Sequence, residues 1–212
     1  MKTSANYTYS LLMAIFLISP SIMRAEDTGN AIKRSRISWA LMPQFNLNIP
    51  GNWKTFKPYD KTNISYGGGI GCACRIQLKG NWFIDGDVSI CYDNLHISAS
   101  KVIPHAISLE RLSVPISISI EHSFGISDEM DILPLTGIEG SYCFSNKVSD
   151  SIDMPDFNWN HLNLSWGIGC GLCFYDKYEI DIIGYFGLLH MISQSDIDLY
   201  ANKIRMSFKY FF

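Results

Sequence analysis

Six cysteines are the first residues in this 212-residue chain whose type could support chemistry. The spacing Cys170-Gly171-Leu172-Cys173 is that of a redox pair or of two zinc ligands. In a strand, positions three apart point to opposite faces, so these two sulfur atoms would not share a metal. We interpret all six cysteines as small apolar residues, and a disulfide between Cys91 and Cys143 is the alternative.

Two glycine-rich stretches, residues 67–71 and 167–171, resemble loops that cradle phosphate. A nucleotide-binding fingerprint follows a strand and opens a helix, and no helical pattern follows either stretch. We therefore expect these glycines at crowded positions on the inner face of a sheet, and we expect no cofactor.

Histidine and aspartate offer the remaining candidates for chemistry. The five histidines fall at expected strand ends or in loops, and they are His96, His105, His122, His161 and His190. A lipid-modifying enzyme with its active site at a barrel rim would use a His beside a Ser, but no spacing here fixes a nucleophile next to a base. Asp150, Asp153 and Asp156 do not have the spacing of a calcium-binding loop. We predict no catalytic residue and no metal site.

The elements that must position these residues are strands. Nearly every patterned segment alternates apolar and polar side chains with period two, and none after the N-terminal 25 residues keeps a helical period. The eight expected strands lie near residues 36–49, 66–78, 82–92, 109–122, 132–145, 162–174, 178–188 and 203–212. An even number of strands is what a single-chain bacterial outer-membrane barrel requires.

The links between these strands alternate between long and short. Such barrels keep short turns on the periplasmic side and long loops outside the cell. The sequence therefore predicts an all-β fold, an eight-stranded antiparallel up-and-down transmembrane β-barrel with short periplasmic turns and longer extracellular loops. Across the two tightest turns we expect Arg75 to face Asp85 and Gly171 to face Asp181, so that opposite charges meet and small residues make room for large ones.

Charged and apolar residues separate completely between the two faces of the expected strands. A Lys or Arg that faced lipid at mid-depth would cost about 2–4 kcal/mol, so the charges belong to the lumen. The predicted lumen charge network is Arg75, Asp85, Asp87, Arg111, Glu121, Glu139, Glu179, Asp181, Arg205 and Lys209. The predicted aromatic girdles contain Trp82, Tyr92, Trp166, Phe174, Tyr178 and Phe186.

The last strand alternates up to a C-terminal phenylalanine. Phe208, Tyr210 and Phe212 share its apolar face, the pattern with which outer-membrane barrels end, and we predict that they form a C-terminal assembly signal for the barrel-assembly machinery during insertion.

The N-terminus predicts export. Lys2 precedes an apolar run that is too short to span a bilayer, so residues 1–25 are interpreted as a cleaved signal peptide. Residues 26–35 would form a short periplasmic segment, and residues 36–212 the barrel domain in the cell outer membrane. A net charge of −3 argues against a nucleic-acid partner. Outer-membrane lipid and lipopolysaccharide are the expected partners, and the sequence names no extracellular ligand.

Three prolines interrupt the expected strands. Pro43, Pro115 and Pro134 each remove a ladder hydrogen bond, so we expect bulges or strand ends near them. The segment Arg111–Ile118, with Leu133–Gly137 and Tyr185–Leu188, resembles strand motifs of the porin-family outer-membrane β-barrel domain of Gram-negative bacteria, often called PorT-like. This resemblance implies a fold and a compartment, and it carries over no catalytic residue.

Three further functions remain open at this point. The strongest structural alternative is a soluble lipocalin-like ligand binder, with the apolar face inside. The others are a lipid-modifying enzyme at the barrel rim and a narrow channel. We expect a non-enzymatic protein, structural or surface-binding through its extracellular loops, because an eight-stranded barrel is just wide enough for its own side chains.

Overall fold

The structure, a computed structural model, describes residues 37–49, 64–97, 107–149, 158–191 and 199–212. All of them belong to one compact unit that spans residues 35–212. The expected signal peptide and the segment 26–35 lie outside the described residues.

Within the described ranges, no helix is both long and apolar enough to cross a membrane.

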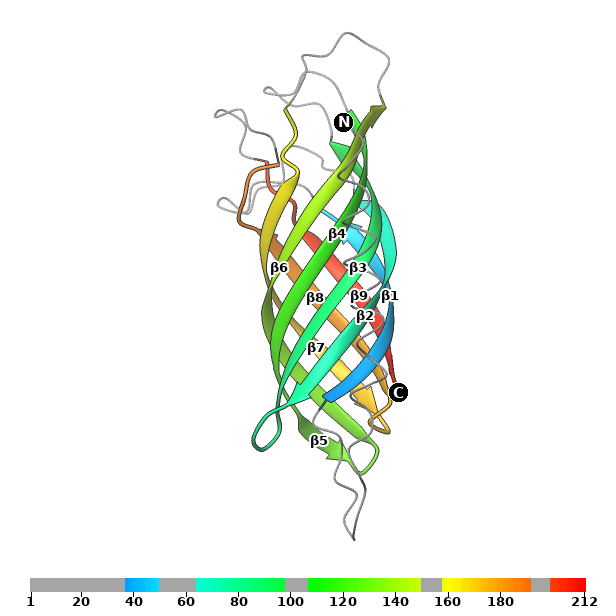
Figure 1. Ribbon diagram of the computed structural model, residues 1–212, viewed down its shortest axis with the longest axis vertical. Coiled ribbons are helices and arrows are strands. Elements are labelled where there is room, and N and C mark those ends of the chain that lie inside the picture. The colour runs from blue at the N-terminus through cyan, green and yellow to red at the C-terminus, as the bar shows by residue number, and fades with distance from the viewer. Residues whose placement is uncertain (1–36, 50–63, 98–106, 150–157, 192–198) are drawn as a thin grey trace, which may run out of the picture. The chain divides into compact units, whose positions relative to one another are not determined.

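The described residues form one antiparallel sheet that closes on itself (Figure 1). Its strands are β1 (Ile37–Asn48), β2 (Ser65–Gln77), β3 (Trp82–Ile97), β4 (Ile107–His122), β5 (Phe124–Ser127), β6 (Met130–Ser149), β7 (Leu162–Phe174), β8 (Tyr178–Gly187) and β9 (Lys203–Phe211). Strands that follow each other in the chain are neighbours in the sheet, except that β4 pairs with β6. β1 pairs with β9 and so joins the first strand to the last.

Strand β5 is the continuation of β4. Glu121 pairs with Leu135 and Phe124 pairs with Ile132, so the register on β6 is the same before and after the break. The molecule is therefore a closed eight-stranded barrel, which confirms the predicted architecture.

The predicted pairings across the two tight hairpins are confirmed. Arg75 faces Asp85 between β2 and β3, and Gly171 faces Asp181 between β7 and β8. Because a slip of one residue would turn every side chain to the other face, this register fixes which residues point inward.

Tight turns join the strands at one end of the barrel, which we call the short-turn end; the opposite end is the long-loop end. Gly80 has a φ of 73° in the first turn, and Tyr175 and Asp176 have φ of 53° and 56° in the last. Two successive residues with positive φ make the type I′ geometry whose twist matches the flanking strands. The described barrel begins and finishes at the short-turn end (Figure 1).

Several strand limits differ from those predicted. β3 continues past Tyr92 to Ile97, β4 begins at Ile107, and β6 continues to Ser149. The extended ends of β3 and β6 each pair with the start of β4, beyond the residues where β2 and β7 begin. This pairing shortens the expected links 93–108 and 146–161. At the short-turn end, the expected link from Gly125 to Asp131 is mostly strand.

Each of the three prolines lies at an interruption of one ladder that resumes in the same register. An irregularity of the expected kind also lies near Pro115, because the register of β4 on β6 shifts between Leu112 and Ser113. The pairing of β1 with β9 skips Met42 and Pro43, and the pairing of β3 with β4 skips Pro115 and its neighbour Val114. Pro134 lies opposite the break between β4 and β5. Each proline keeps its partner on its other side, so the missing N–H costs one bond and leaves the barrel closed.

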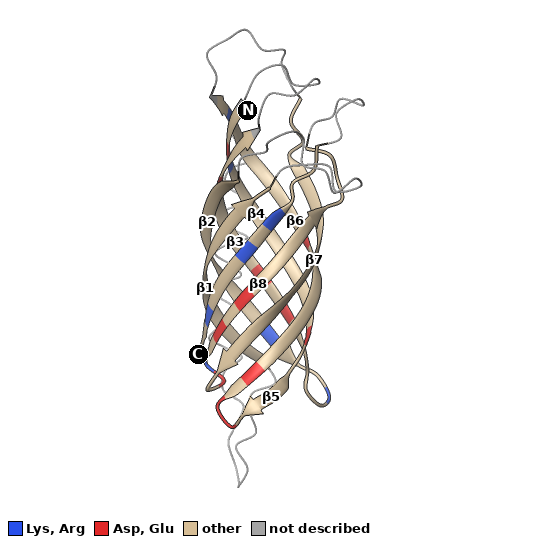
Figure 2. Cartoon of the chain, turned by 180° about the vertical axis from the view of Figure 1, so that it is seen from behind, with Lys and Arg blue, Asp and Glu red and all other residues tan. Residues whose placement is uncertain are grey.

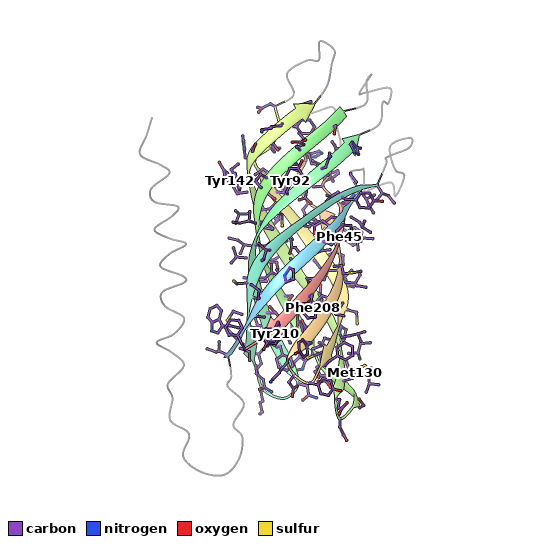
Figure 3. All side chains as sticks on the ribbon, turned by 90° about the vertical axis from the view of Figure 1, so that its right-hand side faces the viewer. Phe45, Tyr92, Met130, Tyr142, Phe208 and Tyr210 are labelled. Carbon is purple, nitrogen blue, oxygen red and sulfur yellow. The ribbon has the colours of Figure 1, made fainter. Side chains whose placement is uncertain are left out.

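Apolar side chains cover the outer surface of the barrel (Figure 3). Along β9, Ile204, Met206, Phe208 and Tyr210 are exposed, whereas the alternate positions are buried. The residues inside are a mixture of charged, hydroxyl and amide side chains with a few bulky apolar ones such as Met42 and Leu133.

Candidate functional site

The charged side chains of the barrel strands are mostly buried in the lumen. Figure 2 shows where along the strands these charged residues lie. All ten residues of the predicted lumen charge network are buried, and they come from β2, β3, β4, β6, β8 and β9. Six of them are carboxylates and four are cations. The alternation of the strands brings them together because every second residue points inward.

The charges nearest the short-turn end form one group, the short-turn network. Its members are Arg75, Asp85, Glu121, Glu179, Asp181 and Lys209. One terminal nitrogen of Arg75, Nη2, lies 2.9 Å from Asp85, 2.5 Å from Glu121 and 2.7 Å from Glu179. The rings of Phe211 and Phe83 lie 4.6 and 5.3 Å from the Arg75 guanidinium and cover it.

Lys209 is the second cation of the short-turn network. Its Nζ lies 2.8 Å from Asp85, 2.9 Å from Glu179 and 2.9 Å from Asp181. These three contacts match the three donors of an ammonium group. The network therefore holds four carboxylates against two cations; Lys209 uses all three of its donors, whereas Arg75 is bound through its terminal nitrogens.

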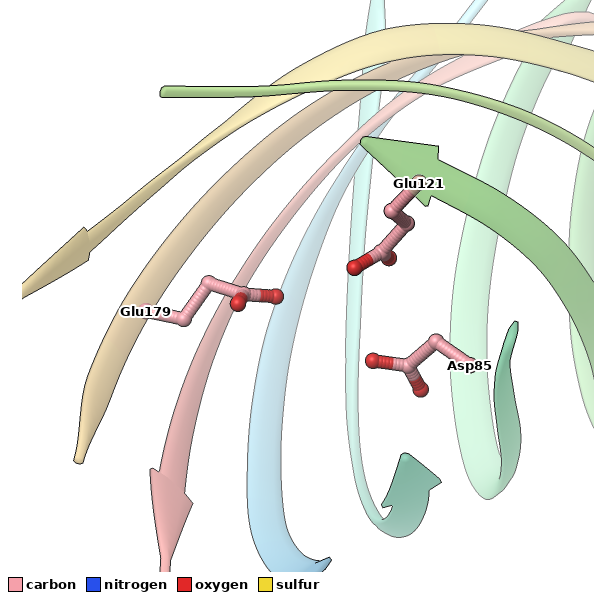
Figure 4. A group of neighbouring side chains, drawn as sticks. All are labelled: Asp85, Glu121 and Glu179. Atoms are coloured by element: carbon pink, nitrogen blue, oxygen red, sulfur yellow. The ribbon is translucent and has the colours of Figure 1, made fainter. Parts of the chain in front are cut away.

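Three carboxylates of this network converge as metal ligands would. One oxygen each from Asp85, Glu121 and Glu179 lies within 4.8 Å of the others (Figure 4). Arg75 Nη2 contacts all three groups, so it takes the position that a cation would occupy. The arrangement is a structural ion network in which a side chain supplies the positive charge.

A second group of charges lies around Arg205. Its guanidinium donates to both oxygens of Asp87, at 3.2 and 3.0 Å, which is the bidentate geometry that suits arginine. Ser117 donates a further hydrogen bond to Asp87. Glu139 lies 2.7 Å from Lys203 and 3.6 Å from Arg205. Here cations and carboxylates are equal in number.

Lys203 was missing from the predicted network, although the pattern of its strand contains it. It lies two residues before Arg205, and residues two apart in a strand point to the same face, so its side chain also points inward. Its side chain is 12% exposed and pairs with Glu139. Asp93 was missed too, because Asp93-Asn94 resembles the start of a turn.

A cavity of about 40 Å³ lies at the long-loop end of the lumen. We call it the vestibule. It is lined by Asn48, Asp93, Leu95, Arg111, Ser113, Glu139, Ser141, Cys143, Asn163, Ser165, Ala201, Asn202 and Lys203. Most of these side chains can donate or accept hydrogen bonds, so the vestibule offers both donors and acceptors to a ligand.

The described histidines make contacts that do not build a catalytic pair. His161 Nδ1 lies 2.6 Å from the backbone oxygen of Cys143, and His190 Nε2 lies 3.2 Å from the hydroxyl of Tyr200. His122 lies between the rings of Trp82 and Phe124. Among the described residues, no hydrogen bond joins His122 or His161 to a serine hydroxyl. His105 and the three aspartates of the acidic loop lie outside the described residues.

All six cysteines are free thiols, including Cys91 and Cys143. Cys173 is buried and Cys170 is exposed, so the two sulfurs of the Cys-x-x-Cys spacing point to opposite sides of β7. Gly167, Gly169 and Gly171 face inward on the same strand, opposite Tyr185, Ile183 and Asp181. These glycines give the bulky side chains of β8 their space.

The predicted girdle residues lie on the outer surface. Trp82, Tyr92, Trp166 and Tyr178 are exposed, and Phe174 and Phe186 are partly exposed. Trp166 stacks on Phe186 with 5.9 Å between ring centroids, and Tyr178 stacks on Phe208 at 6.2 Å. Figure 3 labels Tyr92 and Tyr142 toward one end of the outer wall and Phe208 and Tyr210 toward the other. Phe212 is exposed as well.

Comparison with known proteins finds solved structures that match this chain at low identity. No protein-family model and no curated protein sequence matches this chain. Neisserial surface protein A has a TM-score of 0.47 and 7% identity, covering 82% of this chain and 97% of that one.

Two further solved structures have comparable scores. The attachment invasion locus protein of Yersinia pestis, in complex with the heparin analogue sucrose octasulfate, has a TM-score of 0.46 and 14% identity over 84% of this chain and 99% of that one. The outer membrane enzyme PagL has a TM-score of 0.46 and 13% identity over 80% of this chain and 98% of that one. These values carry no argument about function.

Proposed function

We propose that this chain is a non-enzymatic integral outer-membrane β-barrel protein, structural or surface-binding through its long-loop end. The observation that carries the proposal is the separation of faces in a closed barrel. All ten charges of the predicted network are buried in the lumen, and large apolar side chains such as Ile116, Ile118 and Ile182 are exposed on the outer wall. A bilayer is the environment that stabilises such a surface, and closure leaves the described sheet without a free edge strand in it.

The barrel's two ends then have different surroundings. The short-turn end would face the periplasm and the long-loop end the cell exterior, as in other single-chain barrels. Outer-membrane lipid and lipopolysaccharide would contact the outer wall, and the barrel-assembly machinery would insert the chain. The resemblance to PorT-like barrels stays a prediction, since no family model matches.

The arrangement of the faces argues against a lipocalin-like binder. A lipocalin keeps its apolar residues inside around a ligand, whereas this lumen contains Asp85, Arg75, Glu179 and their partners. The filled lumen also argues against a channel.

A lipid-modifying enzyme at the rim is the second candidate. His161 is exposed at the long-loop end, and its hydrogen bond to a backbone carbonyl leaves Nε2 available as a base. A catalytic site would need a nucleophile beside it. Substituting His161→Ala should leave the lipid profile of the cell unchanged, and a lost lipid modification would favour the enzyme.

Membrane fractionation and gel mobility test the main proposal. The protein should sediment with outer membranes, and its electrophoretic mobility should differ between unheated and boiled samples because the closed barrel resists detergent. A soluble protein with one mobility in both samples would refute it.

A further inference from the structure

Two opposite charges at the long-loop end face each other and do not pair. Arg111 on β4 and Asp93 on β3 are direct cross-strand partners. Arg111 is only 4% exposed, so its charge is almost entirely removed from solvent. Among the described residues, no ion pair joins Arg111 to Asp93 or to any other carboxylate. Two inward side chains in this relation would ordinarily form a salt bridge.

Asparagine side chains hold the two charges apart. Asn46 and Asn48 of β1 both donate to Asp93 Oδ1, at 3.0 and 2.9 Å, and draw the carboxylate to one wall. Arg111 Nε donates to Asn146 of β6 at 3.1 Å. With the Asn163 amide of β7 turned so that its oxygen faces Arg111, that oxygen accepts from both terminal nitrogens of Arg111, at 3.1 and 3.2 Å.

The vestibule lies between these two walls and is lined by both charged groups. Its volume of about 40 Å³ exceeds the roughly 10–15 Å³ that a cavity needs to hold one water molecule, so it has room for more than one hydroxyl group. Arg111 Nη2 also donates to the backbone oxygen of Asn160 at 3.4 Å, so the donor left for a ligand is one N–H of Nη1. Asp93 offers acceptors, and both groups are fixed before anything binds. A site whose polar groups are already oriented spares a ligand the cost of ordering them.

The charge of the lumen decides what kind of group fits. The ten buried charges include six carboxylates and only four cations. That excess lies in the short-turn network, whereas the vestibule is lined by two carboxylates, Asp93 and Glu139, and two cations, Arg111 and Lys203. Its charges balance, so an ionised ligand of either sign would add an uncompensated charge. A neutral group that both donates and accepts hydrogen bonds avoids this cost.

We propose that the vestibule binds the hydroxyl edge of a neutral saccharide, with one hydroxyl oxygen accepting from Arg111 and the adjacent hydroxyl donating to Asp93. The inference rests on the proposed function, which places this end of the barrel outside the cell. The amide groups of Asn163 and Asn202 and the hydroxyls of Ser113 and Ser165 complete the lining. The saccharide would belong either to the cell's own lipopolysaccharide or to another surface.

NMR spectroscopy of the side-chain amide groups, with the folded protein in detergent micelles, tests the proposal. Titration with free D-glucose, D-galactose and D-mannose should shift the signals of Asn48, Asn163 and Asn202 in a saturable way for at least one sugar. Asp93→Asn and Arg111→Gln should each weaken that binding about tenfold or more, because each removes a charge-assisted hydrogen bond. Lys147→Gln removes an exposed cation from β6 and should change nothing.

Three outcomes would overturn the saccharide site: no shift with any sugar, stronger binding of sulfate or glycine than of sugar, or unchanged affinity in both variants. If Arg111→Gln fails to fold, Asp93→Asn decides alone. Lipid-free polysaccharide released from the cell's own lipopolysaccharide distinguishes the two sources. If the ligand is the cell's own lipopolysaccharide, this polysaccharide should bind more tightly than the free sugars; otherwise it should not. Heat-dependent gel mobility of the same samples reports the barrel itself, so loss of sugar binding with normal mobility contradicts only this inference.

Discussion

Arg75 shows how a single side chain decides the character of the lumen. Its guanidinium touches three carboxylates that would otherwise form a cation cage. Removing one partner from a buried ion network leaves uncompensated charge, which costs far more than the pair contributes. The short-turn network holds four carboxylates and two cations. We therefore expect the loss of a cation to lower the free energy of unfolding more than the loss of a carboxylate.

Arg75→Gln should lower the free energy of unfolding by about 3–5 kcal/mol, because three carboxylates lose their shared partner. Glu121→Gln should change it by less than about 1 kcal/mol or raise it, because it removes one of the excess negative charges. Urea unfolding in lipid vesicles measures both. Equal losses in the two variants would show that the network is not short of positive charge.

The alternation along each strand predicted most of the residues that point into the lumen. The sequence could not show which of these residues contact one another. Arg205 and Lys209 are inward because β9 alternates, and the same rule applied to Lys203 would have included it. The contacts of Arg75 with Glu179 join residues 104 positions apart, so they depend on the closure of the barrel. The asparagines that hold Asp93 and Arg111 were not singled out, because an uncharged polar residue on an inner face carries no distinct signal.

At the scale of the strand, glycines have a role that depends on the face they occupy. A Cβ atom at Gly169 on β7 would meet the backbone oxygen of Ile182 and lie 2.8 Å from the Cα of Ile183. A Cβ atom at Gly140 on β6 would meet nothing within 4 Å. Backbone atoms of a paired strand cannot move aside without disturbing the ladder.

Gly169→Ala should therefore destabilise the folded barrel by about 1–3 kcal/mol, the usual cost of overpacking. Gly140→Ala is the matched control and should be neutral or slightly stabilising, because alanine restricts the unfolded chain. The urea midpoint of each variant gives the comparison. Similar midpoints for both would mean that β7 and β8 adjust more freely than the packing suggests.

Strand number, order and register could be predicted from alternation and from the lengths of the links. Strand limits could not, and Asp93-Asn94 shows why: residues typical of turns ended the predicted third strand, while the pairing of Leu95 with Leu109 carries it further. The prolines were expected to disturb the strands, and the register alone shows that each breaks only one of two ladders.

At the scale of the whole molecule, the two ion networks and the bulky inner residues fill the lumen. Met42, Leu133 and Ile183 are almost fully buried between the charged groups. Apart from the vestibule, eight strands leave little room beyond such a filling.

The purified barrel should therefore produce no unitary conductance steps in planar bilayers, tested beside a porin of larger strand number as the positive control. Reproducible steps at a constant amplitude would show that the lumen opens.

The central claim is that the outer wall contacts lipid, and nitroxide accessibility in lipid vesicles tests it most directly. Labels at Ile116 and Ile182, both exposed on the outer wall, are introduced after the outward cysteines have been replaced by serine. They should collide frequently with dissolved oxygen and rarely with a water-soluble nickel chelate, whereas a label at Lys79 in a short turn should show the reverse. Equal nickel accessibility at all three positions would contradict a membrane-embedded barrel.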